Sequence, residues 1–177
     1  MSFKEAQQDM RKSYLGGGPG VFSSGLIWIT AGFTAFFNTK QISVLVFFFG
    51  GMLIHPLGIL ISKLLKRSGK HQKGNPLAIL AMESTLMLFI GLFIAYLSLQ
   101  FRPNWFFPIM TLIIGGRYLV FSSIYGMRVY WLFGTVLILS GIVGIVFNLP
   151  FYFIGLIGGG IELFFSIIIL YLEKKHS

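Results

Sequence analysis

Four ionisable side chains lie inside long apolar stretches of this sequence: His55, Glu83, Arg117 and Glu162. A charge at bilayer depth costs several kcal/mol, so such residues are paired, hydrated or used in function. Arginine stays protonated and can hold one carboxylate through two parallel hydrogen bonds. The second carboxylate then needs a proton, a cation or the imidazole of His55. The set therefore predicts either a site that couples protons or cations, or a static Glu–Arg–Glu network that joins helices.

The composition is that of a membrane protein. Of 177 residues, 55% are hydrophobic and 11% are charged, whereas a soluble domain carries about 25% charged residues. So few charges cannot cover the surface of a water-soluble domain. The net charge of +9 comes mainly from Lys and Arg that flank the apolar stretches, which indicates membrane topology rather than nucleic-acid binding. The absence of cysteine excludes disulfides and thiolate metal sites.

Six apolar stretches are each long enough to cross about 30 Å of hydrocarbon as a helix. The sequence therefore predicts an all-α, polytopic membrane bundle in which residues 1–177 form one membrane domain. Its six transmembrane helices form three tandem hairpins, at residues 19–64, 77–126 and 129–172. The individual spans are 19–37, 41–64, 77–100, 106–126, 129–149 and 151–172.

The distribution of basic residues predicts the orientation. Eleven Lys and Arg residues fall on the side that holds both termini and the 66–76 loop, and only Lys40 and Arg102 fall on the other side. Basic residues mark the cytoplasmic side of a membrane protein. Both termini are therefore predicted to be cytoplasmic, in a multi-pass protein of the inner (plasma) membrane.

Two segments on the basic side are candidates for contact with the membrane surface. Residues 3–14 have the pattern of a short amphipathic helix, which can lie in the membrane interface. Three glycines, at 16, 17 and 18, then predict a flexible hinge that completes a cytoplasmic segment 1–18. The loop supplies candidate ligands for anionic lipid head groups, although membrane topology alone also explains them. These candidates are Lys66, Arg67, Lys70 and Lys73.

In each even-numbered span a glycine pair precedes an ionisable residue by one to four positions. This pattern predicts parallel repeats of one hairpin, as in some transporters. Small residues at helix interfaces explain the pairs equally well without a repeat. The pairs are Gly50-Gly51 before His55, Gly115-Gly116 before Arg117, and Gly159-Gly160 before Glu162.

The four ionisable residues are expected at similar depth. At about 1.5 Å per residue, they lie about 9 to 15 Å from the cytoplasmic ends of their spans. Charged side chains within a membrane face the bundle interior, so we expect the four to converge there. Pro56 removes a backbone hydrogen bond beside His55 and kinks the second span. This span is predicted to be either a moving helix or a helix with a rigid packing kink.

Four stretches carry a resemblance to a known family: residues 9–14 followed by three glycines, 75–83, Trp105-Phe106-Phe107-Pro108, and 114–119 (Ile-Gly-Gly-Arg-Tyr-Leu). They resemble the corresponding stretches of an uncharacterised bacterial family of six-span membrane proteins. The resemblance implies a location in the bacterial inner membrane. It implies no activity and no functional residues.

These features predict an integral membrane protein and leave two classes of function open. The first is a small ion or solute transporter, or a channel-like protein, with the buried Glu/Arg/His cluster as its site. The alternative is a structural or regulatory protein that binds membrane lipids or a partner, a second copy of the chain included, with the cluster as a static packing network. An enzyme is not favoured, because the spans show no nucleophile with its base and no set of metal ligands. No cofactor or metal is predicted.

Overall fold

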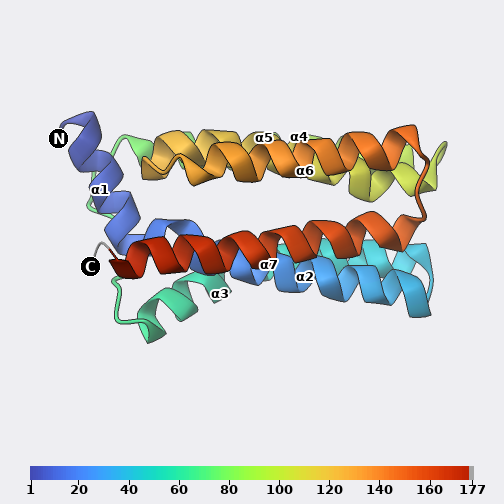
Figure 1. Ribbon diagram of the computed structural model, residues 1–177, viewed down its shortest axis with the longest axis horizontal. Helices are drawn as coiled ribbons and strands as arrows, with labels where there is room; N and C mark the ends of the chain where they lie inside the picture. Colours follow the sequence, from blue (N-terminus) through green and yellow to red (C-terminus); the bar gives the residue numbers. More distant parts are fainter. Residues whose placement is uncertain (176–177) are drawn as a thin grey trace.

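The computed structural model describes residues 1–175 and is helical almost throughout (Figure 1). A short helix, α1 (Phe3–Tyr14), precedes six long ones. Two 3-10 turns, η1 (Leu15–Gly17) and η2 (Pro103–Trp105), lie at connections. The long helices are α2 (Gly18–Phe37), α3 (Lys40–Leu64), α4 (Leu77–Ser98), α5 (Phe106–Tyr125), α6 (Val129–Val146) and α7 (Phe151–Lys175).

The predicted all-α bundle with six spans is confirmed. Six segments of the described chain are long and apolar enough to cross a membrane, and each contains one of the helices α2 to α7. The amphipathic N-terminal helix is also present. It begins with a capping box, in which the Ser2 hydroxyl accepts from the Glu5 backbone N–H and the Glu5 carboxylate accepts from that of Ser2.

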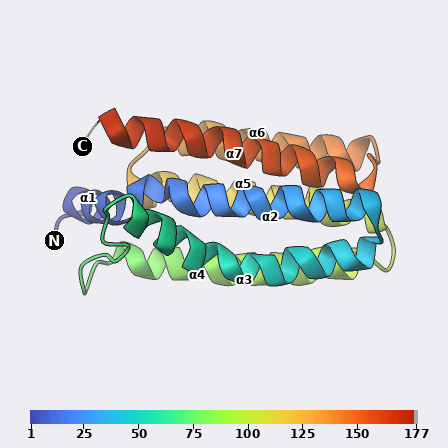
Figure 2. The same ribbon diagram turned by 90° about the horizontal axis from the view of Figure 1, so that it is seen from below.

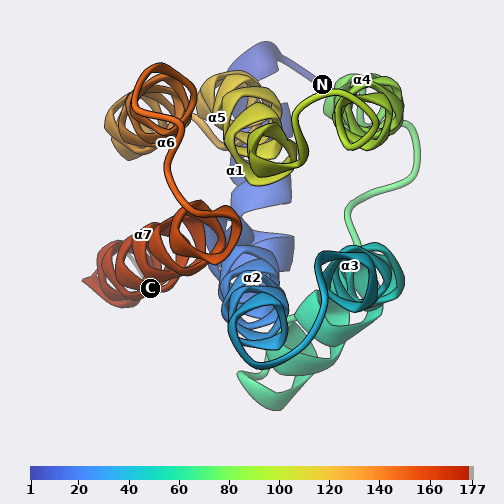
Figure 3. The ribbon, with the colours of Figure 1, turned by 90° about the vertical axis from the view of Figure 1, so that its right-hand side faces the viewer.

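The six long helices form two rows. Seen along the bundle axis (Figure 3), one row contains α6, α5 and α4, and the other contains α7, α2 and α3. The first two predicted hairpins are packed pairs, α2 with α3 and α4 with α5. The third hairpin is splayed, because α6 packs mainly on α5 and α7 packs mainly on α2. The connection between α6 and α7 therefore crosses from one row to the other.

Glycines bring α2 and α7 into backbone contact. A Cβ atom on Gly25 would lie 3.0 Å from the backbone nitrogen of Leu163, and one on Gly32 would lie 2.9 Å from that of Leu156. Real Cβ atoms are rarely found so close to backbone atoms. Such small residues allow close packing of helices in a membrane, where hydrophobicity alone does not drive helices together.

The pair α5 and α6 has the same construction. A Cβ atom on Gly134 would lie 2.6 Å from the Gly115 carbonyl oxygen, and one on Gly141 would lie 2.7 Å from the Pro108 carbonyl oxygen. Both α5 and α6 contribute glycine to this contact. We refer to the α2–α7 and α5–α6 contacts together as the glycine seams.

The glycine pairs of the even-numbered spans share one arrangement. The first glycine of each pair faces a neighbouring helix, and a Cβ atom on the second would meet no atom within 4 Å. This shared arrangement is consistent with the predicted repeat. The first glycines, with their neighbours, are Gly50 against Ile27, Gly115 against Gly134, and Gly159 against Gly25 and Ile29.

Aromatic side chains join the two rows. Trp28 of α2 lies 5.5 Å, between ring centroids, from Phe107 of α5 and 4.8 Å from Phe47 of α3. Phe133 of α6 stacks on Phe165 of α7 with centroids 4.6 Å apart. These rings are buried, so the core runs between the rows on the side of the glycine seams.

Both termini and the 65–76 loop lie at one end of the bundle (Figure 2), which we call the basic end. Helix α1 lies across this end. Gln7 donates through Nε2 to the Ser123 carbonyl at 2.7 Å, and Arg11 forms an ion pair with Glu173 of α7 at 2.5 Å. The buried face of α1 therefore packs on protein.

The predicted glycine hinge is a tightly packed corner. Gly16 and Gly17 have φ angles of 60° and 85°, a conformation that favours glycine. A Cβ atom on Gly16 would lie 2.6 Å from the sulfur of Met127, and one on Gly17 would lie 2.7 Å from the hydroxyl of Tyr130. That hydroxyl also donates to the Gly16 carbonyl at 2.6 Å. These contacts favour a fixed turn over a flexible hinge.

Candidate functional site

A pocket of about 630 Å³ lies between α3 and α4. Its back wall is formed by α2 and α5, and α1 closes its basic end. The volume falls within the range of about 300 to 1,000 Å³ that small-molecule sites occupy. The pocket is thus large enough for an organic ligand.

The pocket opens sideways, through the outer surface of the bundle. Helices α3 and α4 scarcely touch each other, and the long 65–76 loop is their direct connection (Figure 3). Side chains at the opening, such as Met52 of α3 and Met82 and Phe89 of α4, are more than half exposed. Because both helices have the length and composition of membrane spans, the opening would face lipid.

The pocket is polar near the basic end and apolar further in. Its polar lining there includes Tyr14, His55, His71 and Arg117. Tyr14 and His71 meet at the basic end, where the Tyr14 hydroxyl lies 2.9 Å from His71 Nδ1. The inner half is lined by the apolar and aromatic side chains Trp28, Phe47, Phe48, Leu88, Leu92 and Met110.

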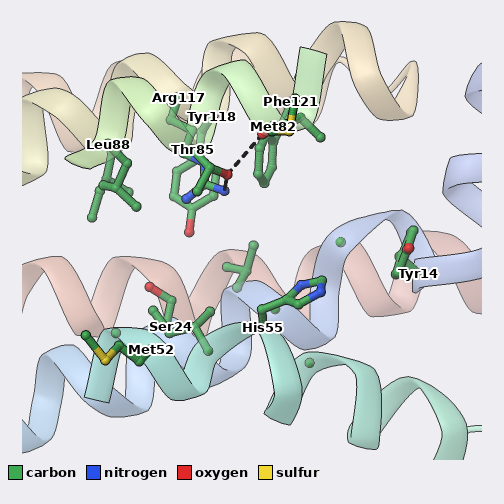
Figure 4. A pocket seen from close by; sticks show the side chains of 18 of the residues that line it. Tyr14, Ser24, Met52, His55, Met82, Thr85, Leu88, Arg117, Tyr118 and Phe121 are labelled. Atoms are coloured by element: carbon green, nitrogen blue, oxygen red, sulfur yellow. Dashed lines mark hydrogen bonds between the residues drawn. The ribbon is translucent and has the colours of Figure 1, made fainter. Parts of the chain in front are cut away.

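Arg117 is the one arginine among the described residues that line the pocket. It comes from α5 and donates through Nη2 to the hydroxyl of Thr85 on α4 at 2.9 Å (Figure 4). Its guanidinium carbon lies 5.2 Å from the ring centroid of Phe121, one turn nearer the basic end. The buried Nε atom has no hydrogen-bond partner, and no ion pair joins Arg117 to a carboxylate within residues 1–175.

Glu162 lies in the core, behind the pocket wall. Its side chain is fully buried, and its Oε1 atom accepts a hydrogen bond from the Tyr118 hydroxyl at 2.8 Å. Ser24 of α2 faces the same carboxyl group. The second oxygen, Oε2, has no partner with good hydrogen-bond geometry among the described residues. Glu162 therefore belongs to the contact between α5 and α7.

The structure separates the four residues that were expected to converge. His55 lines the pocket from α3, across from Arg117 (Figure 4). Glu162 is buried in the core, and Glu83 is exposed on α4 outside the pocket lining. Glu83 lies outside the pocket because of its position around the axis of α4. Successive residues of a helix are rotated by about 100°, so Glu83 points about 200° away from Thr85, which faces Arg117. The expected convergence of all four residues is therefore wrong: His55 and Arg117 share the pocket, Glu162 interacts with Arg117 only through charge, and Glu83 faces away.

Pro56 lies within α3, directly after His55. The part of α3 nearer the basic end turns away from the bundle axis (Figure 1), as expected for a helix that contains a proline. Two residues later, Gly58 packs on α2, where a Cβ atom would lie 3.1 Å from the Gly20 Cα atom. The bend thus lies at the pocket, between its polar and apolar halves.

The predicted lipid-binding residues of the loop lie beside the basic end of the pocket. Lys66, Lys70 and Lys73 are exposed, and Arg67 is half-buried. His71 of the same loop lines the pocket. Its contact with Tyr14 was not expected from the sequence, because the two residues are 57 positions apart and no motif links them. Within residues 1–175, no group of acidic residues or histidines could hold a metal ion.

The sequence model of a family of unknown function (DUF7010) matches residues 3–172. No curated protein and no solved structure matches the chain.

Proposed function

The chain belongs to this family of unknown function, and we propose that it binds a lipid-like amphiphile in the pocket between α3 and α4. The ligand would enter sideways from the bilayer. This proposal corresponds to the second of the two classes of function that the sequence left open, a membrane protein that binds lipid. The binding itself can be regulatory or structural.

One observation carries the proposal: an apolar pocket of about 630 Å³ that opens between two membrane-spanning helices and holds one arginine. An opening toward lipid favours ligands that partition into the bilayer. The apolar lining favours a hydrocarbon chain, and a small number of polar groups can fix the orientation of the ligand. A water-soluble solute would gain little from most of this surface.

The contacts of the ionisable residues give less support to a site that couples ions. Such a site needs its carboxylates, arginine and histidine close together, whereas Glu83 and Glu162 both lie outside the pocket lining. Glu162 bonds to Tyr118 in the core. The surroundings of Glu162 support a static role in helix packing, which was the alternative predicted for these ionisable residues.

Two matched glycine substitutions test the proposal. Gly51 lines the pocket and Gly160 lies on α7 outside it; both are exposed within helices, and an added Cβ atom would meet nothing at either. Gly51→Leu fills pocket volume, and Gly160→Leu adds the same side chain to the outer surface. The probe is a phospholipid with a diazirine in its acyl chain, photo-activated in nanodiscs. Labelling is read by peptide mass spectrometry at Trp28 and Met110, which line the pocket and are almost fully buried.

We expect the wild type and Gly160→Leu to be labelled at Trp28 and Met110, and Gly51→Leu to lose most of that labelling. Lipid that merely surrounds the protein would label the exposed faces instead. Labelling confined to those faces in the wild type would refute the proposal. Equal labelling of the buried positions in both variants would do so as well.

Release or transport of the bound molecule is a second candidate function, and the bend of α3 at Pro56 favours it. A bend between the two halves of the pocket gives α3 a point at which it could move against α2. Proteoliposomes that contain wild type, Glu83→Gln, Arg117→Gln or Glu162→Gln would be tested for proton, cation and lipid flux. Flux that depends on Arg117 supports this function. No flux in the wild type argues against it and leaves the binding proposal to the labelling experiment.

A further inference from the structure

We infer that the ligand of this pocket is an anionic amphiphile whose single carboxylate or phosphate group binds Arg117 and whose chain points away from the basic end. This inference rests on the proposed function and names the ligand class. Four features of the pocket support it: a charge without an ion-pair partner, the fixed position of that charge, a gradient of polarity, and a basic surface beside the pocket.

No side-chain carboxylate forms an ion pair with Arg117 among residues 1–175, and Glu162 interacts with it only through charge, beyond ion-pair distance. Glu83 lies outside the pocket lining, on the exposed surface of α4. The other four carboxylates are engaged elsewhere: Glu5 caps α1, Asp9 accepts from Asn75 and from the Gln72 backbone, Glu162 accepts from Tyr118, and Glu173 pairs with Arg11. A guanidinium in a membrane without a carboxylate partner is costly. An anionic ligand would compensate it.

Thr85 holds the guanidinium in a defined position. Its hydroxyl accepts from Arg117 Nη2 at 2.9 Å and donates to the Ala81 carbonyl at 3.0 Å. The Phe121 ring supports the guanidinium from the side of the basic end. Nε is left without a partner among residues 1–175. Arginine binds carboxylates and phosphates through paired N–H groups, so a guanidinium held in one position in the pocket wall is suited to such a head group.

The polarity of the pocket sets the direction of the ligand. Arg117 lies two helical turns before the end of α5 at Tyr125, about 12 Å from the basic end. Most polar groups lie between that level and the basic end, and the lining beyond it is mainly apolar. A lipid of the adjacent leaflet has the same direction, with its head toward the basic end and its chain toward the bilayer centre. The depth of Arg117 favours a small head group.

The surface near the pocket is basic. His71 of the loop lines the pocket, and Lys70 and Lys73 of the same loop are exposed. Each basic residue near a membrane attracts anionic lipid by about 1 kcal/mol. The loop residues that were predicted to bind lipid head groups can thus raise the local concentration of the ligand class that Arg117 would bind.

Tryptophan fluorescence can measure the head-group preference directly. Trp28 lines the pocket, whereas Trp105 and Trp131 lie outside it; replacing both with Phe leaves Trp28 as the reporter. The probes are three C16 chains with a bromine near the chain end that quenches tryptophan: a carboxylate, an alcohol and a trimethylammonium. We expect the carboxylate to quench Trp28 at about tenfold or more lower concentration than the other two, because hydrogen bonds to charged groups contribute that much.

Substitutions at arginine identify the residue responsible. Arg117→Gln should remove the preference for the carboxylate, and Arg117→Lys should retain part of it, because lysine keeps the charge without the planar donors. Arg128→Gln is the matched control. Arg128 is exposed at the basic end and outside the pocket lining, so its substitution removes the same charge and should leave the preference unchanged. Thermal unfolding of each variant confirms that it is folded.

The outcomes separate this inference from the proposed function. If carboxylate and alcohol quench equally, and Gly51→Leu weakens both, the pocket binds amphiphiles and the head-group assignment is wrong. If Gly51→Leu weakens neither, the proposed function fails as well. Acetate and inorganic phosphate are added as competitors without a chain. Displacement of the C16 carboxylate by either at equal concentration would assign Arg117 to a soluble anion and overturn the amphiphile.

Discussion

The two sides of this bundle are built differently. On one side, the glycine seams bring α2 against α7 and α5 against α6 at backbone distance. On the other side, α3 and α4 stand apart and the pocket lies between them. Both sides are made of similar apolar helices. Hydrophobicity therefore does not explain why one side is closed and the other is open.

The positions of the glycines explain the difference. The seams use glycines that face backbone, such as Gly25 and Gly134. At the opening, Gly51 of α3 faces no atom within 4 Å, and Gly91 of α4 faces Ile113 of α5 rather than α3. Without a hydrophobic force between helices in lipid, close packing decides which pairs associate. The α3–α4 pair has no glycine contact, and the space between the two helices is left for a ligand.

The largest predicted effect compares two adjacent glycines of α7. Gly159→Ala places a methyl group 2.8 Å from the Ile29 backbone nitrogen, whereas the methyl group of Gly160→Ala meets nothing. Both variants gain about 0.5 to 1 kcal/mol of helix stability, but overpacking costs about 1 to 3 kcal/mol at Gly159 alone. Thermal unfolding in detergent should thus show a lower melting temperature for Gly159→Ala and a slightly higher one for Gly160→Ala.

Gly115→Ala and Gly116→Ala repeat the comparison on α5. Gly115 faces the Gly134 carbonyl oxygen, and Gly116 faces no atom within 4 Å. The same order of stability is expected. If the two members of either pair are equally stable, the seams do not depend on glycine and the explanation of the open side fails.

The second predicted effect tests the polar contact on the closed side. Tyr118→Phe removes the hydrogen bond to the buried Glu162 carboxyl group, and an unsatisfied buried group costs about 1 to 3 kcal/mol. The control is Tyr96→Phe, since Tyr96 is exposed on α4. Thermal unfolding in detergent should show a lower stability for Tyr118→Phe and an unchanged stability for Tyr96→Phe. Equal stability of the two variants would show that the hydrogen bond to Glu162 does not stabilise the packing of α5 on α7.

The sequence was sufficient to predict the elements of the fold. Apolar length identified the six spans, and the capping residues Ser2 and Glu5 lie at the start of the predicted helix 3–14. The distribution of basic residues placed both termini and the loop on one side, and they lie at one end of the bundle. Which side of a membrane this end faces remains a prediction. Each of these features depends on residues that are close together in the sequence, so a single sequence is sufficient to predict them.

The partners of the ionisable residues could not be predicted in the same way. Depth along a helix follows from residue number, but the direction in which a side chain points depends on how the helix is rotated against its neighbours. Glu83 and Arg117 have similar depth, yet Thr85 rather than Glu83 faces Arg117. The splayed third hairpin could not be predicted either, because the length of a connection does not determine which row a helix joins. An error in rotation converts a predicted cluster into separate sites.

A smaller effect is expected at the basic end, where an ion pair joins α1 to α7. Arg11→Gln breaks the ion pair with Glu173, which is partly exposed and contributes about 1 kcal/mol or less. Hydrogen exchange should rise in α1 and stay unchanged in the glycine seams. Lys12→Gln is the control, because Lys12 is exposed on the same helix. Faster exchange throughout the bundle would show that α1 supports the seams.

The smallest effect on stability is expected on the open side, at Arg117. Without ligand, Arg117→Gln loses a hydrogen bond to Thr85 but also removes a charge that has no carboxylate partner within the described chain, and the two changes offset each other. With a long-chain carboxylate at 100 times its dissociation constant, the wild type should gain about 2.7 kcal/mol and the variant little. Thermal unfolding with and without the carboxylate measures both. A large loss for the ligand-free variant would mean that Arg117 is part of the packing, and that the open side is stabilised by its charge rather than prepared for a ligand.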